Sequence, residues 1–309
     1  MTSLTEKPGS PGKAAVIGLG SMGLGMARSL KRSGLDVSGY DVNPAAVDQL
    51  VDSHGRGAAT PADAAKDADI VVSVVVNAAQ TEAVLFGVNG VAEAMLPGAV
   101  FISSATMDPS VARKLSERLE ASGRLYLDAP ISGGAARAAS GELTIMASGS
   151  SQAFEKARPA LDAMAAMVYE LGDTAGTGAA FKMINQLLAG VHIAAACEAF
   201  TFAAKQGLDL HKVYEVITAS AGNSWMFENR MPHVLAGDYR PLSAVEIFVK
   251  DLGIIQDMAR SEGYPVPLAA AALQMYLAAT GSGMRRDDDA SLARVYAQLS
   301  GTKLPGAAG

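Results

Sequence analysis

The sequence predicts an α/β protein, with a doubly wound sheet at the N-terminus followed by an all-helical C-terminal domain. Short runs of small and β-branched residues alternate with helical periodicity from Ala14 onward, and these strand signals stop after Gly172. A chain of 309 residues is also long enough for two domains. We therefore expect one domain at 13–174 and a second at 175–309.

The predicted strands show little polar alternation. This is typical of a parallel sheet with helices on both faces, because neither face of such a sheet meets water. The predicted strands are 14–17, 37–40, 70–76, 100–103, 125–128 and 143–147.

The second domain has helical periodicity, with Gly and Pro residues between its segments. The predicted helices are 179–206, 209–219, 243–261, 268–279 and 288–299. The first of them is so apolar that we expect it to pack against its neighbours and a second subunit. The sequence thus predicts a homodimer or a homotetramer.

Composition excludes several classes of protein. Half of the residues are apolar and 18% are charged, which supports packed cores rather than a disordered chain. The net charge of −6 favours neither nucleic acid nor a membrane surface as a partner. Residues 1–13 lack the apolar core of a signal peptide, and no uninterrupted apolar stretch reaches membrane-spanning length. Cys197, the single cysteine, has apolar neighbours and is expected to be buried, so we expect a cytoplasmic protein.

A glycine motif follows the first predicted strand and opens a helix: Gly18-Leu19-Gly20-Ser21-Met22-Gly23. This context is the one that a dinucleotide-binding Rossmann turn requires. Gly18 would allow the tight turn, Gly20 the approach of the pyrophosphate, and Gly23 close packing of the helix on the strand. The alternative is a βα turn with a purely structural role.

Asp41 ends the second predicted strand, where Rossmann domains place an acidic residue on the adenosine ribose. Its carboxylate would repel the 2′-phosphate of NADP, and neither Val42 nor Asn43 supplies a cation. NAD is therefore the expected cofactor. Alternatively, Asp41 only starts a turn and caps the next helix.

Lys182 and Asn185 lie three residues apart on the first helix of the second domain, so they share a face, towards the cleft expected between the domains. Apolar neighbours and a nearby cationic nicotinamide both favour the neutral amine that a base towards an alcohol needs. Physical reasoning alone favours a simpler alternative, in which the lysine stem lies along apolar surface and the amine reaches water.

Four segments together resemble the β-hydroxyacid dehydrogenase family, of the 3-hydroxyisobutyrate dehydrogenase type. They are 18–23, 128–134, 178–185 and 250–252, in the family's order over nearly the whole chain. The resemblance implies an NAD-dependent hydroxyacid dehydrogenase with an NAD-binding first domain and a second domain for substrate binding and oligomerisation.

The resemblance also implies roles for single residues. Lys182 would be the general acid/base, Asn185 would orient the substrate, and Lys250 would approach the nicotinamide. The segment Ser132-Gly133-Gly134 would bind the substrate carboxylate, for which a hydroxyl and exposed backbone N–H groups are suited. Without the resemblance, this segment would be a hinge or turn, and Lys250 would form a surface ion pair with Asp251.

Three further segments, 76–80, 186–193 and 221–231, resemble family members that oxidise the C2 hydroxyl of the four-carbon sugar acid L-threonate. Asn185 departs from this subgroup, in some members of which a histidine is expected. 3-Hydroxyisobutyrate and tartronate semialdehyde stay as alternative substrates, because the four shared motifs do not distinguish between these acids. An alternative of another class is a non-catalytic protein that binds dinucleotide.

Several residues outside the four segments complete the predicted site. Trp225 would line a pocket for a polyhydroxylated substrate, with core packing as the alternative. By analogy with the family, Val75, Val76 and Thr106 contact the nicotinamide half of the cofactor. The four histidines have no ligand spacing, so no metal is indicated. The acidic run 287–289 is expected to be a solvated helix cap rather than a cation site.

Overall fold

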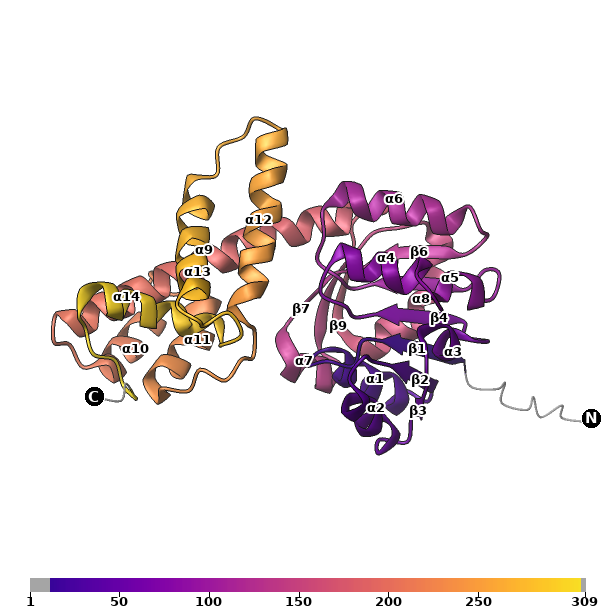
Figure 1. Ribbon diagram of the computed structural model, residues 1–309, viewed down its shortest axis with the longest axis horizontal. Helices are drawn as coiled ribbons and strands as arrows, with labels where there is room; N and C mark the ends of the chain where they lie inside the picture. Colours follow the sequence, from indigo (N-terminus) through magenta and orange to yellow (C-terminus); the bar gives the residue numbers. More distant parts are fainter. Residues whose placement is uncertain (1–11, 307–309) are drawn as a thin grey trace, which may run out of the picture. The chain divides into compact units, whose positions relative to one another are not determined.

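The computed structural model describes residues 12–306, so most of segment 1–13 lies outside the described residues. The chain divides into two compact units, one up to Lys182 and the other from Met183 (Figure 1). Unit 1 contains the strands, and unit 2 is built from helices. The predicted fold class, a Rossmann domain followed by an all-helical domain, is confirmed.

Six parallel strands form the main sheet of unit 1, in the order β3-β2-β1-β4-β5-β6. They are β1 Lys13–Ile17, β2 Asp36–Tyr40, β3 Arg56–Gly57, β4 Ile70–Ser73, β5 Val100–Ser103 and β6 Leu125–Asp128. Since β1 pairs with both β2 and β4, the strand order reverses there. In such sheets ligands bind at this reversal, beyond the carboxyl ends of the strands.

Helices cover both faces of the main sheet. They are α1 Gly23–Arg32, α2 Pro44–Val51, α3 Pro61–Ala65, α4 Ala78–Phe86, α5 Val91–Ala94, α6 Pro109–Glu120, α7 Gly134–Ser140 and α8 Ser151–Met164. Successive residues of β1 point to opposite faces, so Val16 packs in one apolar cluster and Ile17 in another. This burial on both faces explains the lack of polar alternation in the sequence.

A second sheet has three strands, β7 Ile131–Ser132, β8 Leu143–Ala147 and β9 Ala165–Glu170. β8 pairs antiparallel with β7 and parallel with β9. Placing 143–147 in the main sheet was therefore wrong. Thr144 and Met146 are only partly buried, so this strand does alternate, and five residues are too few for the sequence to assign the sheet.

Unit 2 contains most of α9 Thr177–Lys205, followed by five helices and a 3-10 turn. They are α10 Leu210–Thr218, α11 Trp225–Ala236, α12 Val245–Ser261, α13 Pro267–Gly281, η1 Asp289–Ser291 and α14 Leu292–Ser300. The five predicted helices are confirmed, the last beginning as a 3-10 turn. Sequence reasoning missed α11, because it interpreted Pro232 as a boundary whereas the helix runs through it.

Helix α9 is long and apolar enough to cross a membrane by length and composition, although polar residues such as Lys182 and Glu198 interrupt its apolar run, as expected from the sequence. Half of its most apolar window is nevertheless buried inside the protein. Cys197 is fully buried, as predicted, and packs with Phe200 and Tyr276 in the core of unit 2. We therefore describe α9 as the half-buried core helix of a soluble protein.

The acidic run 287–289 also differs from expectation, because Asp288 and Asp289 are fully buried. Asp289 Oδ1 pairs with Arg230 Nε at 2.5 Å. Asp288 caps η1 by accepting the Ala290 N–H at 3.1 Å. The helix cap was predicted correctly. The expectation that these carboxylates are exposed to water was wrong, because the sequence does not show that Arg230 lies against this run.

Candidate active site

The carboxyl ends of the strands in the main sheet lie in register. Ile17 pairs with Tyr40 and Ser73, Ser73 with Ser103, and Ser103 with Asp128. The chain continues from these ends into the predicted site residues of unit 1: the glycine motif, Asp41, Val75 and Val76, Thr106, and Ser132-Gly133-Gly134. The fold thus brings five separate segments to one edge of the sheet, where doubly wound sheets bind ligands.

The three glycines of the motif meet different steric limits. Gly18 has a φ of +93°, and a Cβ there would lie 2.5 Å from the carbonyl oxygen of Val74. At Gly23 a Cβ would lie 1.8 Å from the carbonyl oxygen of Gly18. A Cβ on Gly20 would meet nothing within 4 Å. Two glycines therefore make the turn and the third keeps one side open, which fits a dinucleotide.

Asp41 binds the glycine loop directly. Its Oδ2 accepts the backbone N–H of Leu19 at 2.6 Å, and its Oδ1 accepts that of Asn43 at 2.8 Å. The side chain of Asn43 caps α2 by accepting from Ala45. Asp41 is thus part of the turn, as the alternative interpretation predicted, but it is not the helix cap. Its carboxylate lies beside the loop, where this fold binds the adenosine ribose.

Beyond β4 the chain turns at the same edge. Val75 contacts the turn, since its Cγ1 would lie 3.4 Å from a Cβ on Gly18. Val76 is 47% exposed, and its N–H donates to Gln80 Oε1 at 2.8 Å. Thr106, after β5, is partly buried. These segments offer apolar surface next to the glycine loop, which suits a flat nicotinamide ring.

The Ser132-Gly133-Gly134 segment links β7 to α7. Ser132 pairs with Thr144 of β8. Gly133 has a φ of +134° and Gly134 a φ of +77°, which L side chains rarely adopt. A Cβ on Gly134 would meet nothing within 4 Å, so the backbone is open there. Open backbone beside a hydroxyl fits the carboxylate-binding role that the resemblance implies.

This segment also lies near the glycine motif, because α7 packs on α1. A Cβ on Gly25 of α1 would lie 2.8 Å from the nitrogen of Ala139 in α7. Ser29 Oγ donates to the carbonyl oxygen of Ala138 at 3.1 Å. The two predicted anion-binding segments are therefore held by one pair of packed helices.

Lys182, on α9, is only 7% exposed. The alternative of a lysine that reaches water from an apolar surface is therefore wrong. Asn185 and Gln186 lie one helical turn further on, on the same face, and Gln186 is likewise 7% exposed. A lysine this buried is unusual unless it is paired or functional.

A chain of hydrogen bonds in unit 2 joins two predicted site residues. Asn185 Nδ2 donates to Gln186 Oε1 at 3.0 Å, and Gln186 Nε2 donates to Asp251 Oδ2 at 2.5 Å. Asp251 Oδ1 lies 2.5 Å from Lys250 Nζ. The ion pair between Lys250 and Asp251 that the alternative predicted is therefore present, but it is not a surface pair, because Asp251 is fully buried.

Sequence reasoning missed Gln186 and gave Asp251 no role. A polar residue on the same face as Lys182, in an otherwise apolar helix, was an available signal for Gln186. Its partner was not visible, because the two residues are 65 positions apart. Asp251 contacts Asn185 through the amide of Gln186 and Lys250 directly, so it connects both predicted site residues.

A glycine allows α9 and α12 to approach each other at this point. A Cβ on Gly190, one turn after Gln186, would lie 3.0 Å from Phe248 and 3.1 Å from Leu252 of α12. Contacts this short would require the side chains of Phe248 and Leu252 to shift by a few tenths of an ångström. The absence of a side chain at Gly190 therefore helps to bring Gln186 and Asp251 within hydrogen-bond distance.

Trp225 begins α11 and is 50% exposed, which excludes core packing. Ser224 caps this helix by accepting the N–H of Phe227 at 3.0 Å. Asn223 Nδ2 donates to Glu228 Oε1 at 2.5 Å and braces the same turn. These hydrogen bonds hold the first turn of α11 in place and with it the Trp225 side chain, as a substrate-contacting residue would require.

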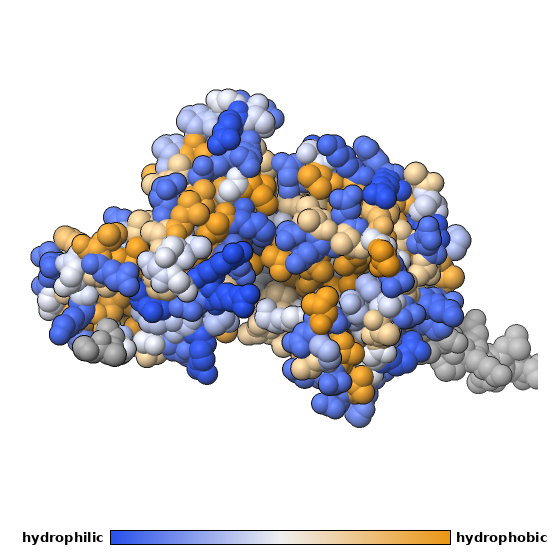
Figure 2. Space-filling model, in the orientation of Figure 1, coloured by the Kyte–Doolittle hydropathy of each residue, from blue (hydrophilic) through white to orange (hydrophobic). Residues whose placement is uncertain are grey.

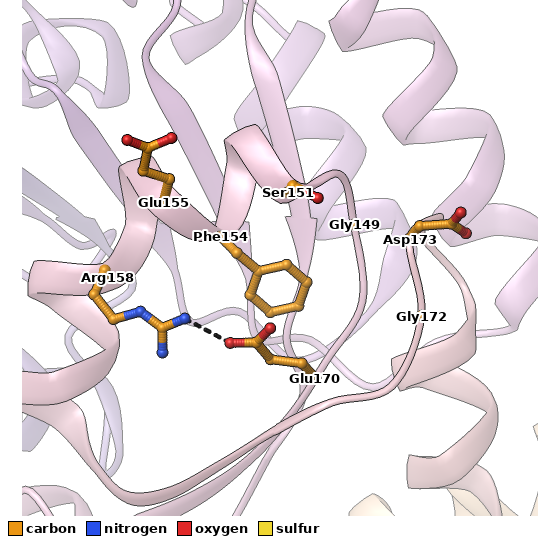
Figure 3. Close-up of a pocket in the computed structure, with 8 residues that line it drawn as sticks. All are labelled: Gly149, Ser151, Phe154, Glu155, Arg158, Glu170, Gly172 and Asp173. Atoms are coloured by element: carbon orange, nitrogen blue, oxygen red, sulfur yellow. Dashed lines mark hydrogen bonds and ion pairs between the residues drawn. The ribbon is translucent and has the colours of Figure 1, made fainter.

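The pocket in Figure 3 lies elsewhere in unit 1, has a volume of about 590 Å³, and contains none of the predicted site residues. Phe154 lies beside the ion pair of Arg158 and Glu170, which is 2.5 Å long. Glu155 and Asp173 add further carboxylates. This surface does not suit an anionic substrate. Within residues 12–306, no three His, Cys, Asp or Glu side chains form a possible metal site.

The fold and the site define an NAD(P)-dependent hydroxyacid dehydrogenase, and comparisons with known proteins agree. Residues 13–172 match the NAD-binding domain of 6-phosphogluconate dehydrogenase, and residues 176–296 match the NAD-binding domain of NADP-dependent 3-hydroxyisobutyrate dehydrogenase. The chain belongs to the 3-hydroxyisobutyrate dehydrogenase-like family.

Relatives match over nearly the whole chain. The L-threonate dehydrogenase of Cupriavidus necator is 53% identical, covering 95% of this chain and 98% of that protein. The mitochondrial 3-hydroxyisobutyrate dehydrogenase of Mus musculus is 31% identical over 89% of this chain and 84% of its own length. A crystal structure of 3-hydroxyisobutyrate dehydrogenase from Salmonella typhimurium has a TM-score of 0.88 at 48% identity, covering 92% of this chain and 99% of that one.

Proposed function

We propose that the protein oxidises L-threonate at its C2 hydroxyl to 2-dehydro-L-erythronate, with NAD as the oxidant. The observation that carries this proposal is the 53% identity, over 95% of the chain, to the L-threonate dehydrogenase of Cupriavidus necator. Segments 76–80, 186–193 and 221–231 support it, because they resemble the enzymes that act on this acid.

Unit 1 supplies the residues that fit the cofactor. The open side of Gly20 accommodates the pyrophosphate, and the Asp41 carboxylate favours a free ribose hydroxyl over the 2′-phosphate of NADP. Val75, Val76, Thr106 and, from unit 2, Lys250 would hold the nicotinamide half. When bound, NAD supplies the acceptor for the hydride that leaves C2 of the substrate.

The chain's own residues position the substrate and move its proton. The hydroxyl and N–H groups of Ser132-Gly133-Gly134 bind the carboxylate, and the Asn185 amide orients the hydroxyl. Lys182 Nζ, as a neutral amine, takes the hydroxyl proton while the C2 hydrogen leaves as hydride and the carbonyl bond forms. Trp225 would contact the sugar-acid chain. In this assignment the domain 13–174 binds NAD, and the domain 175–309 binds the substrate and forms the contacts between subunits.

The test is turnover of L-threonate, D-erythronate, 3-hydroxyisobutyrate and glycerate, each with NAD and with NADP. We expect the highest kcat/KM for L-threonate with NAD. A clear preference for 3-hydroxyisobutyrate would transfer the proposal to that acid, while activity only with NADP would overturn the assignment of Asp41.

A second experiment tests the lysine. Lys182→Met should lower kcat about 1,000-fold, as loss of a general base does, while NADH binding is retained. The matched control is Lys205→Met at the other end of α9, where the amine binds the carbonyl oxygen of Ser300. If both variants turned over like the parent, Lys182 would not be the base.

Two other functions stay as alternatives. The likeness to the Salmonella typhimurium structure favours 3-hydroxyisobutyrate dehydrogenase, and tartronate semialdehyde reductase shares the same four motifs. A non-catalytic dinucleotide-binding protein is the alternative of another class. Retention of Lys182 in a buried position argues against it.

We further propose that the enzyme is a cytoplasmic homodimer or homotetramer that associates through unit 2. Ile184, Leu188 and Phe202 of α9 are 64%, 49% and 65% exposed. An apolar pocket of about 820 Å³, lined by parts of α9, α10 and α11, lies in the same unit. Figure 2 shows apolar side chains reaching the surface of this unit. Sedimentation equilibrium that detects only a monomer would contradict this proposal.

A further inference from the structure

The first turn of α9, which precedes Lys182, is held by two side chains at strand ends in unit 1. Asp128, the last residue of β6, is fully buried, and its Oδ2 accepts the N–H of Gly176 at 2.9 Å and that of Ala179 at 2.8 Å. Ser148 Oγ, just after β8, accepts the N–H of Gly178 at 2.9 Å. These bonds satisfy three N–H groups that the start of a helix would otherwise leave unpaired.

Two glycines of this turn also lie too close to their neighbours to carry a side chain. Gly176 has a φ of +100°, and a Cβ there would lie 2.7 Å from the carbonyl oxygen of Pro109. A Cβ on Gly178 would lie 2.3 Å from the carbonyl oxygen of Met146 in β8. Close contact and hydrogen bonds together fix where α9 begins.

The Asp128 carboxylate is not explained by stability. Its Oδ1 is buried and has no hydrogen-bond partner among residues 12–306. Burial raises the pKa of the carboxyl to about 6, so keeping it ionised at neutral pH costs free energy of folding. An asparagine could accept the same two N–H bonds without charge. What the charge adds is strength, because an ionised acceptor at a helix N-terminus binds N–H groups more tightly.

We propose that Asp128 is a positioning residue, which sets the place of Lys182 by clamping the first turn of α9 to the end of β6. The inference rests on the proposed role of Lys182 as general acid/base. Ala179, whose N–H the carboxylate binds, lies three residues before Lys182 on the same helical face. Any displacement of this turn is therefore passed to the lysine stem.

The main experiment compares Asp128→Asn with Asp128→Ala, using the hydroxy acid that the enzyme turns over best. Since a displacement of about 1 Å can cost about 100-fold in rate, we expect kcat to fall about 100-fold in Asp128→Ala and about 10-fold in Asp128→Asn. The KM for NAD should stay within about twofold in Asp128→Asn, because the glycine loop is untouched.

The kinetic isotope effect separates positioning from general damage. With substrate deuterated at the carbon that loses hydride, the isotope effect on kcat should rise in Asp128→Asn, because slowed chemistry becomes rate-limiting. Partial unfolding would only reduce the active fraction and leave the isotope effect unchanged. The matched control is Asp69→Asn. Asp69 lies at the amino ends of the strands of the same sheet, just before β4, and its carboxylate pairs with Lys156 at 2.8 Å. It should leave kcat and the isotope effect as in the parent.

A pH profile in the reductive direction gives a second readout. In that direction Lys182 acts as the general acid, so its active form is the protonated one and is not lost at low pH. A fall of kcat below about pH 6 would therefore report protonation of Asp128. Arg113 and Tyr126 also face this carboxyl: the charge of Arg113 lowers the pKa of Asp128, and burial moves the pKa of Tyr126 far above neutrality. Asp128→Asn should lack this acid limb.

The outcomes are distinguishable. Parental kcat, isotope effect and acid limb in Asp128→Asn, together with an inactive Lys182→Met, would overturn the positioning role and leave the proposed function intact. An active Lys182→Met would overturn the role of Lys182 as the base, on which the inference rests, and turnover of L-threonate would still test the proposed function separately. Equal losses in Asp128→Asn and Asp69→Asn would also overturn the inference, because the effect would then not be specific to α9.

Discussion

The two units build their parts of the site in different ways. In unit 1 the ligand-binding edge is shaped by backbone: Gly18 and Gly23 make a turn that no side chain could enter, and Gly20 keeps one side open. In unit 2 side chains orient one another, through the chain from Asn185 to Lys250. Sites of the first kind show in the sequence as glycine spacing, whereas sites of the second kind depend on contacts between distant residues.

The largest expected effect tests the backbone-built half. Gly23→Ala places a Cβ 1.8 Å from the carbonyl oxygen of Gly18, so the turn must open. We expect NADH affinity to fall by at least about 100-fold and stability to fall by about 1–3 kcal/mol, as overpacking does. Thermal melts and NADH fluorescence titrations measure these two quantities.

Gly20→Ala is the matched comparison for Gly23→Ala. A Cβ there meets nothing within 4 Å, so the melting temperature should not change while NADH affinity still falls. Equal destabilisation by both substitutions would contradict the division into turn-forming and ligand-facing glycines.

The second prediction tests the half built from side chains. Gln186→Leu removes the amide between Asn185 and Asp251 and leaves the buried carboxylate without one of its donors. We expect kcat/KM for the hydroxy acid to fall about 10- to 100-fold, the range for misplaced substrate contacts. Initial-rate kinetics provide the measurement, with the exposed Gln206→Leu just beyond α9 as the control.

The same variant shows whether the hydrogen-bonded chain acts as one unit. Asp251→Asn alone and the double variant should lose about as much as Gln186→Leu alone, because each breaks the same chain. Independent, additive losses would show instead that Asn185 and Lys250 are oriented separately.

The fold could be predicted to a large extent from the sequence, because buried strands and helical periodicity are local patterns. Segment 143–147 was placed in the wrong sheet, since a strand's partners are not local. Helix α11 was missed because Pro232 is tolerated inside it. In the site, the glycine motif and Lys182 were visible, whereas Gln186 and Asp128 lay in segments that carried the resemblance but were given no role, because their importance comes from tertiary hydrogen bonds.

The third prediction concerns cofactor choice in unit 1. Asp41→Asn removes the negative charge and keeps one oxygen acceptor, for the N–H of either Leu19 or Asn43, while the other oxygen is replaced by an NH2 group that cannot accept. We expect kcat/KM with NADP to rise about 10-fold relative to NAD, because repulsion of a like charge is relieved. Parallel kinetics with both cofactors test this, and an unchanged ratio would show that Asp41 does not discriminate against the 2′-phosphate.

The smallest expected effect is on the stability of unit 1. It concerns Asp128, a carboxylate through which a side chain, rather than backbone, positions a site element in this unit. The pKa of Asp128 rises from 3.8 to about 6 on folding, so its contribution to stability declines as the pH rises through that window and stays unfavourable above it. The shift corresponds to about 3 kcal/mol at most. Asp128→Asn should therefore melt a few °C higher than the parent at pH 8.

The melting curves should converge below about pH 3, where the parent carboxyl is protonated in both states. A lower melting temperature for Asp128→Asn at pH 8 would show that the ionised carboxylate stabilises the fold.

The close approach of α9 and α12 at Gly190 has a consequence for engineering. Substrate preference in enzymes of this kind invites segment exchange between relatives, and the residues around Lys182 are an obvious segment to move. In this protein such a graft would transfer Gln186 and Gly190 without α12, which supplies both the residues that pack on Gly190 and the Asp251 carboxylate that Gln186 binds. We therefore expect that α9 and α12 must be exchanged together, and that a chimera that divides them should fold yet orient its amides wrongly.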